Sequence, residues 1–129
     1  MIILTIKTDN PSAEIGLYKN QEKNKYIVWK AHYELAETIH QKLRELCEQA
    51  NIKLNDIEGI VCFQGPGSYT GLRIGLSIGN AVSYGLNIPI VTAKGKSWIA
   101  TGIKKLIKGR SDLPVLPSYG GKINATLPK

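Results

Sequence analysis

The chain has 129 residues, of which 17 are Lys or Arg and 10 are Asp or Glu, so its formal net charge at pH 7 is +7. With 43% hydrophobic residues, it has the composition of one globular domain, and its length excludes a second full domain. The whole charge excess lies in residues 94–129, because residues 1–93 contain nine basic and nine acidic side chains.

Cysteine content and hydropathy exclude several other classes of protein. Cys47 and Cys62 are too few for a disulfide framework, and both lie among apolar neighbours. The N-terminus lacks the basic segment of a signal peptide. The longest nearly uncharged apolar stretch, within residues 74–86, is shorter than the ~20 residues of a membrane span. We therefore expect a cytoplasmic protein with no membrane contact.

The first part of the chain is predicted to contain strands and the rest to alternate helices with strands. Apolar and β-branched runs predict strands at residues 2–6, 13–18 and 26–31, with residues 19–25 as a hairpin loop. Helical spacing predicts a helix over residues 32–51, and a short apolar run predicts a buried strand at 59–63. We expect a helix from residue 70 to 86 that stops at Asn87, and then a strand at residues 90–92.

A last helix is expected to begin after Ser97 and to end before Gly109, with its apolar positions facing inward: Ile99, Ile103, Leu106 and Ile107. The resulting order, β-β-β-α-β-α-β-α, predicts an α/β fold with a mixed sheet, as in a ribonuclease-H-like or actin-like (ASKHA) lobe. We expect one lobe over residues 1–109. Residues 110–129 are basic and rich in Pro and Gly, which predicts an extended tail.

The most specific segment is the Gly-rich stretch from Gly65 to Gly75. It places a sharp turn between a strand and a helix, where helix N-terminal amides can bind an anion. The stretch is no Walker A loop, because it has Leu72 and Arg73 where that motif needs Lys and Ser or Thr. An ordinary capped helix without a ligand is the alternative. The candidate anion-binding residues are Gly65, Gly67, Ser68, Thr70 and Arg73.

Small residues also recur every four positions in the helix that follows, at Gly71, Gly75, Gly79 and Ser83. A glycine inside a helix costs up to ~1 kcal/mol relative to alanine, and a closely packed second backbone is the usual reason for it. The remaining positions of this helix are apolar nearly all round, which indicates burial on every side. We expect a second protein chain to supply part of that burial. The alternative is that the chain's own first helix and sheet suffice.

Residues 65–75 resemble the Gly-Pro-Gly-Ser-Phe/Tyr-Thr-Gly-Leu-Arg-Ile-Gly signature of the TsaB (YeaZ) family, a bacterial subunit for making threonylcarbamoyladenosine in tRNA. Residues 32–35 resemble the family's His-Ser-x-x-Leu helix start. Residues 54–57 and 97–100 match its Leu-x-Asp-Leu and Ser-Leu-x-Ala-Leu segments. The resemblance covers about residues 1–100 and implies an actin-like lobe.

The resemblance also implies a function and partners. TsaB is a non-catalytic subunit that pairs with the catalytic subunit TsaD in threonylcarbamoyl transfer to the tRNA adenosine next to the anticodon. The pairing uses helices equivalent to residues 32–50 and 70–86. A TsaE-type ATPase, tRNA bound through the complex, and a homodimer in the absence of TsaD are further implied partners. The expected interface residues are Leu35, Ile39, Leu43, Gly71, Leu72, Gly75, Ile78, Gly79, Val82 and Ser83.

The sequence departs from the family in three respects. The family's first strand usually ends in Asp-Thr, where the acid organises a metal-bound nucleotide, whereas this chain has Lys7-Thr8. We therefore expect no ATP or Mg²⁺ cofactor. The 129 residues do not include the family's second actin-like half, so we expect a single lobe. His32 and His40 do not form the His-x-x-x-His pair of TsaD, so we expect no metal site.

Two other functions remain as alternatives. The first is a basic RNA-binding module, because Lys104, Lys105 and Lys108 lie on one face of the last helix and could contact phosphates. A solvated helix end, whose lysines complement the helix dipole, explains the same pattern. The second is a nucleotide-dependent phosphotransferase using the turn at residues 65–70, which the missing first-strand acid disfavours.

Overall fold

The computed structural model describes residues 1–67 and 69–116. Five strands form one mixed sheet in the order β3-β2-β1-β4-β5, comprising β1 (Ile2–Lys7), β2 (Ser12–Lys19), β3 (Glu22–Lys30), β4 (Gly59–Phe63) and β5 (Ile90–Ala93). The strand β2 runs antiparallel to both β1 and β3, whereas β4 runs parallel to both β1 and β5. This arrangement confirms the predicted α/β fold and the predicted order of its elements.

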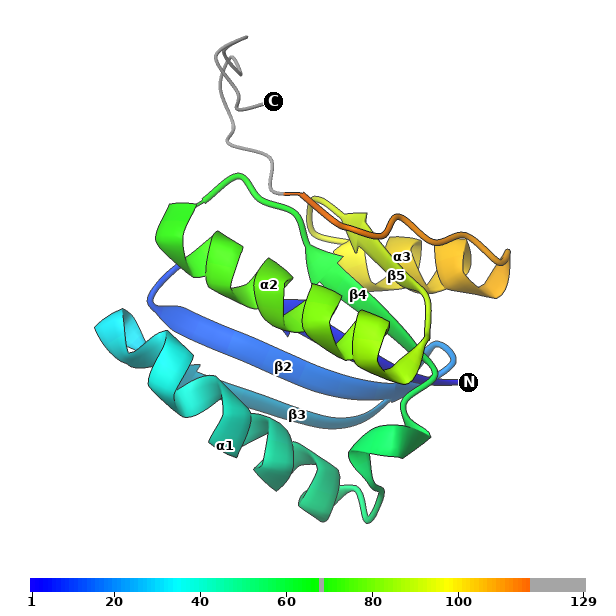
Figure 1. The fold of residues 1–129 in the computed structure, drawn as a ribbon, viewed down its shortest axis with the longest axis horizontal. Coiled ribbons are helices and arrows are strands. Elements are labelled where there is room, and N and C mark those ends of the chain that lie inside the picture. The colour runs from blue at the N-terminus through cyan, green and yellow to red at the C-terminus, as the bar shows by residue number, and fades with distance from the viewer. Residues whose placement is uncertain (68, 117–129) are drawn as a thin grey trace, which may run out of the picture.

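The helices are divided between the two faces of the sheet (Figure 1). Helices α1 (Leu35–Gln49) and α2 (Tyr69–Leu86) lie on one face, where α1 contacts β2 and β3 and α2 contacts β1 and β4. Helix α3 (Trp98–Ile107) lies on the other face and contacts β4 and β5. Across residues 1–67 and 69–116, no helix is long and apolar enough to cross a lipid bilayer.

Each face of the sheet carries its own apolar core. Because side chains alternate along β1, Leu4 and Ile6 pack towards α1 and α2, while Ile3 packs with Val61 and Ile103 under α3. The strand β1 is therefore buried on both faces, as its unbroken apolar run predicts. Both cysteines are free and buried. Burial raises the pKa of the Cys62 thiol to about 12, so that thiol stays protonated at neutral pH.

On the α3 side, the covering helix reaches only half of the sheet. Within the described part of the chain, α3 contacts β4 and β5 but no helix lies over the same side of β2 and β3. Val28 of β3 is consequently 58% exposed. We call this surface the open strand face. It comprises Lys7, Glu14, Tyr18, Lys23, Tyr26, Val28 and Lys30.

Two element boundaries differ from the sequence prediction by three or more residues. The strand β3 begins at Glu22 instead of residue 26, because a two-residue turn with Asn20 at φ 53° replaces the expected long loop. Residues 32–34 form a 3-10 turn, so the first α-helix begins at Leu35. Asn87 has φ 57° directly after α2, which confirms it as the predicted helix stop.

The inward face of α3 is also rotated relative to the prediction. Ile107 was expected inside but is 55% exposed, whereas Trp98 and Gly102 are buried. The reason is the close approach of β4, since a Cβ on Gly102 would overlap the side chain of Val61. Only a glycine at this position lets the helix lie so near the strand. Ile103 and Leu106 are buried as predicted.

Residues 110–116, the start of the predicted extended tail, pack against the lobe. The Asp112 amide donates to the Ile90 carbonyl at 2.7 Å, along the outer edge of β5. Val115 is 2% exposed in the α1/α2 core, and the Asn80 side chain donates to its carbonyl and accepts from its amide. The folded lobe thus extends beyond the boundary expected at residue 109. Residues 117–129 of the predicted tail lie outside the described residues.

Candidate partner-binding site

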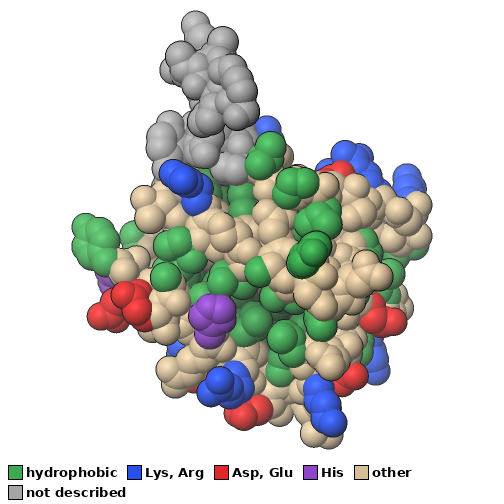
Figure 2. Space-filling view, viewed as in Figure 1, with side chains coloured by type: hydrophobic (Ala, Val, Ile, Leu, Met, Phe, Trp, Pro, Cys, Tyr) green, Lys and Arg blue, Asp and Glu red, His purple; other side chains and the backbone are tan. Residues whose placement is uncertain are grey.

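An apolar band lies between α1 and α2 on the outer surface of the lobe. Leu35 and Ile39 of α1 pack with Ile74 and Ile78 of α2, and the two α2 residues remain half-buried. Val82, one turn further along α2, is half-buried as well. Figure 2 shows hydrophobic side chains gathered between the two helices. The described chain leaves this surface uncovered.

The glycine stripe of α2 faces the chain's own sheet. A Cβ on Gly75 would overlap the hydroxyl of Thr8, and a Cβ on Gly79 would lie 2.6 Å from Cys62 Sγ. Ser83 is 1% exposed and its hydroxyl donates to the Ile88 carbonyl. The close neighbours that require glycine are therefore the side chains of Thr8, directly after β1, and of Cys62 in β4. This finding corrects the expectation that a partner chain fills the stripe.

Most of the predicted interface residues are consequently internal. Leu72 is 1% exposed, and Leu35, Ile39 and Leu43 are buried beneath α1. Only Gly71, Ile78 and Val82 reach the surface in part. On the opposite side of α2, a shallow hollow of about 380 Å³ is lined by Thr70, Arg73 and Ile78, and by two residues that the sequence prediction did not include, Ile74 and Ser77. Their position opposite the glycine stripe is the sequence signal that could have identified them.

The predicted anion-binding turn packs against the loop after β1. A Cβ on Gly67 would lie 2.5 Å from Asp9 Cβ, and Gly65 has φ 113°, so both positions require glycine. The Thr8 hydroxyl donates to the Gly71 carbonyl at 2.7 Å and ties the start of α2 to the end of β1. Thr70 and Arg73 are exposed and belong to the hollow on α2. Ser68 of this candidate site lies outside the described residues.

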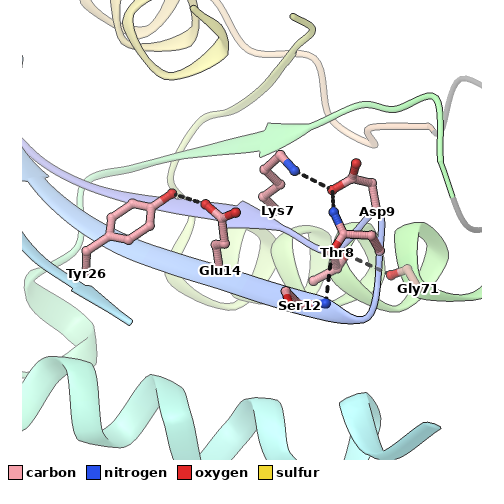
Figure 3. A network of polar contacts seen from close by, with 8 residues as sticks. Lys7, Thr8, Asp9, Ser12, Glu14, Tyr26 and Gly71 are labelled. Carbon is pink, nitrogen blue, oxygen red and sulfur yellow. Dashed lines mark hydrogen bonds and ion pairs between the residues drawn. The ribbon is translucent and has the colours of Figure 1, made fainter. Parts of the chain in front are cut away.

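At the end of β1, Lys7 is paired within the chain. Its ammonium lies 2.6 Å from Asp9 Oδ1 (Figure 3). The same ammonium lies 4.9 Å from the centre of the Phe63 ring. Both charged side chains are largely shielded from solvent, at 18% and 16% exposure. The carboxylate of Asp9 is therefore neutralised by a neighbouring cation. Among the residues with described positions, no three His, Cys, Asp or Glu side chains gather as metal ligands would.

The three lysines predicted as a phosphate-binding patch are separated by the structure. Lys104 and Lys108 are exposed on α3. Lys105 is half-buried, and its ammonium donates to the Thr92 carbonyl of β5 at 2.7 Å. The patch that α3 presents to solvent thus consists of Lys104 and Lys108.

A cavity of about 360 Å³ opens between the starts of α1 and α2, at one end of the apolar band. His32 and Tyr33 line it from the 3-10 turn, Asn10 lines it from the loop between β1 and β2, and Thr70 lines it from the first turn of α2. His32 has φ 49°, and Tyr33 is fully exposed. The residues that resemble the family's helix start therefore border the candidate partner-binding surface.

Comparisons with known proteins place this lobe in a family. A family model described as "TsaD: tRNA N6-adenosine threonylcarbamoyltransferase" matches residues 28–122. The chain is 33% identical to the tRNA threonylcarbamoyladenosine biosynthesis protein TsaB of Bacillus subtilis over 104 residues, which cover 78% of this chain and 44% of that protein.

Two solved structures share the fold. The YeaZ structure from Pseudomonas aeruginosa superposes with a TM-score of 0.67 at 19% identity, covering 72% of this chain and 43% of that one. The RuvC structure from Thermus thermophilus, solved with a Holliday junction, superposes with a TM-score of 0.53 at 13% identity, covering 92% of this chain and 85% of that one. The chain spans less than half the length of the TsaB and YeaZ proteins it matches. It belongs to the family of that threonylcarbamoyltransferase model, and within it to the TsaB/YeaZ-like proteins.

Proposed function

We propose that this chain is a non-catalytic subunit that pairs with a TsaD-type catalytic subunit in threonylcarbamoyl transfer to tRNA adenosine. The uncovered apolar band between α1 and α2 is the main support. Ile74, Ile78 and Val82 form a continuous half-buried row along it. Exposed contiguous apolar surface of this kind marks protein interaction sites.

Aromatic residues at the edges of this surface support the same proposal. Tyr33 is fully exposed beside the start of α1, and Tyr84 is 82% exposed on α2. Tyr84 lies two turns beyond Ser77 and thus on the same side of the helix. Exposed tyrosines are frequent anchors in protein interfaces. Helices of the catalytic subunit pack between these two tyrosines and over the apolar band.

Two further partners follow from the same assignment. Without the catalytic subunit, two copies of this chain pair through the same band about a two-fold axis. In such a dimer, the apolar band of each copy covers the apolar band of the other. A TsaE-type ATPase joins the assembled complex.

The ion pair between Lys7 and Asp9 supports the non-catalytic assignment, because the chain itself engages the carboxylate closest to the end of β1.

Filling the hollow on α2 tests the pairing. Ser77 is exposed and lines the hollow beside Ile74 and Ile78, so Ser77→Trp places a large ring on the surface without disturbing the core. We expect the affinity for the catalytic subunit to fall at least about tenfold, or ~1.4 kcal/mol, in gel filtration and titration calorimetry. Thr101→Trp, at an exposed position of α3, is the matched control and should bind normally. Normal binding by the Ser77→Trp chain would contradict the proposed interface.

The exposed lysines of α3 support tRNA binding by the assembled complex as a second part of the proposal. Lys104 and Lys108 lie on the side of the sheet opposite the apolar band, where they stay accessible in the complex. Exchanging both for Glu should weaken tRNA binding. The slope of the logarithm of the binding constant against the logarithm of the salt concentration should become shallower by about one for each lost phosphate contact. The same double exchange at the exposed Lys19 and Lys25 is the charge-matched control. Equal losses of tRNA affinity in the two double variants would rule out a specific binding patch on α3.

A further inference from the structure

The open strand face is built around a tyrosine that lies across the sheet. A Cβ on Gly16 would sit only 2.5 Å from Cδ1 of Tyr26, so the glycine of β2 makes room for the ring of β3. The Tyr26 hydroxyl donates to Glu14 Oε1 at 2.7 Å (Figure 3). Burial and this hydrogen bond raise the pKa of Tyr26 above its usual range, so the hydroxyl stays protonated. The ring is thus held in one orientation on the surface of the sheet.

Further rings and cations surround Tyr26. Tyr18 meets it edge to face, with ring centres 6.5 Å apart, and the Lys23 ammonium lies 5.4 Å from the Tyr26 ring centre. At the border with α3, the Lys7 ammonium lies over the ring of Phe63. Tyr18, Tyr26 and Phe63 are all partly exposed. Aromatic rings beside lysines are the side chains with which proteins bind single-stranded nucleic acids.

The charges of this surface favour a polyanion. Glu14 is the carboxylate of the open strand face, and the Tyr26 hydroxyl engages it. Asp9, in the loop next to Lys7, is paired with the Lys7 ammonium. Lys23 and Lys30 are exposed, and within residues 1–67 and 69–116 neither has an ion-pair partner. Two cations are therefore available on either side of Val28 and Tyr26. They are placed to contact phosphates on either side of a stacked base.

We propose that the open strand face binds single-stranded RNA, with Tyr18 and Tyr26 stacking against bases and Lys23 and Lys30 contacting phosphates. The inference rests on the proposed function for the choice of RNA as the nucleic acid. The face lies on the side of the sheet opposite the apolar band, so RNA and the catalytic subunit bind without competing. Lys104 and Lys108 of α3 lie on the same side of the sheet and extend the basic surface.

Two lysines of one strand allow a charge-matched test. Lys23 pairs with Tyr18 on the open strand face, whereas Lys25 pairs with Leu17, whose side chain belongs to the core under α1 and α2. Binding of a fluorescent oligouridine of about 12 nucleotides is measured by anisotropy with the purified chain at about 0.1 M salt. Lys23→Glu should weaken binding about tenfold, and Lys25→Glu by less than about threefold.

Two further pairs of variants test the platform itself. Val28 is 58% exposed, so Val28→Asp adds a negative charge in the centre without opening the core, and we expect weaker binding than for Val28→Thr. Tyr26→Phe keeps the ring but releases the Glu14 carboxylate, so it should bind RNA more weakly than the unchanged chain does, and Tyr26→Leu, which also loses the ring, should bind more weakly still. Circular dichroism of each variant checks that the lobe is folded.

Several results would overturn the inference. Equal losses of RNA affinity in Lys23→Glu and Lys25→Glu would show unspecific electrostatic attraction. Tighter binding of an RNA duplex of the same length would exclude stacking of bases on the tyrosine rings. Binding of polyglutamate as tight as that of RNA, unaffected by Tyr26→Leu, would identify an acidic protein as the ligand. Co-elution with the catalytic subunit is measured in parallel. Lys23→Glu should retain it, whereas Ser77→Trp should lose it and still bind RNA, so the two proposals fail independently.

Discussion

Replacing Gly75 by alanine is expected to lower the free energy of unfolding by about 3 kcal/mol, and leucine at this position is expected to prevent folding. The added Cβ would overlap the Thr8 hydroxyl. Thr8 is 3% exposed and donates to the Gly71 carbonyl, so it cannot move aside without breaking the bond that holds the start of α2. A leucine would separate α2 from β1 altogether.

Urea denaturation followed by circular dichroism measures this effect. Gly85→Ala is the matched control in the same helix, because a Cβ there meets no atom within 4 Å. We expect it to stabilise the lobe by up to ~1 kcal/mol, since alanine is the better helix former. If Gly75→Ala were as stable as Gly85→Ala, the glycine stripe of α2 would be free of the sheet and open to a partner.

Replacing Asn80 by alanine is expected to cost about 2–4 kcal/mol of stability. The Asn80 amide donates to the Val115 carbonyl at 3.2 Å, and its Oδ1 accepts from the Val115 amide at 2.9 Å. Its removal leaves both backbone groups unpaired beside a buried valine, and it releases residues 110–116 from the lobe. Asn80 thereby fixes the final described segment of the chain to α2.

Hydrogen exchange of the Val115 amide and urea denaturation measure this loss. Asn80→Asp is the graded control, since it keeps the acceptor for the Val115 amide but loses the donor to the Val115 carbonyl. We expect its stability to lie between those of the unchanged chain and Asn80→Ala. Unaltered exchange at Val115 in the alanine variant would show that another contact holds the segment.

Local patterns sufficed for the order and type of the elements, because they depend on neighbours in sequence. The unbroken apolar run of β1 predicts burial on both faces, and Asn87 tolerates the positive φ that ends α2. The burial of Val115 could not be predicted in this way. It depends on hydrogen bonds to Asn80, which lies 35 positions earlier in the chain.

For the candidate site, the glycines of α2 indicate that this helix packs closely against another element. The sequence does not identify that element. The spacing of Gly75 and Gly79 predicts a close backbone approach, and the structure identifies the neighbour as the chain's own sheet. Once that side is occupied, Ile74 and Ser77 must face outward. Their exposure is therefore a tertiary property, as is the rotation of α3 that buries Gly102 instead of Ile107.

The central position of β1 also determines the order in which the lobe must assemble. Its partner β2 follows after a short loop, whereas its other partner, β4, begins more than fifty residues after β1 ends. Because closing a long loop costs more entropy, we expect the three-stranded meander to form first and the parallel pairing to be the slow step. While the chain emerges from the ribosome, the edge of β1 that later pairs with β4 therefore has no hydrogen-bonding partner strand. This interval is when the nascent chain most needs protection from aggregation.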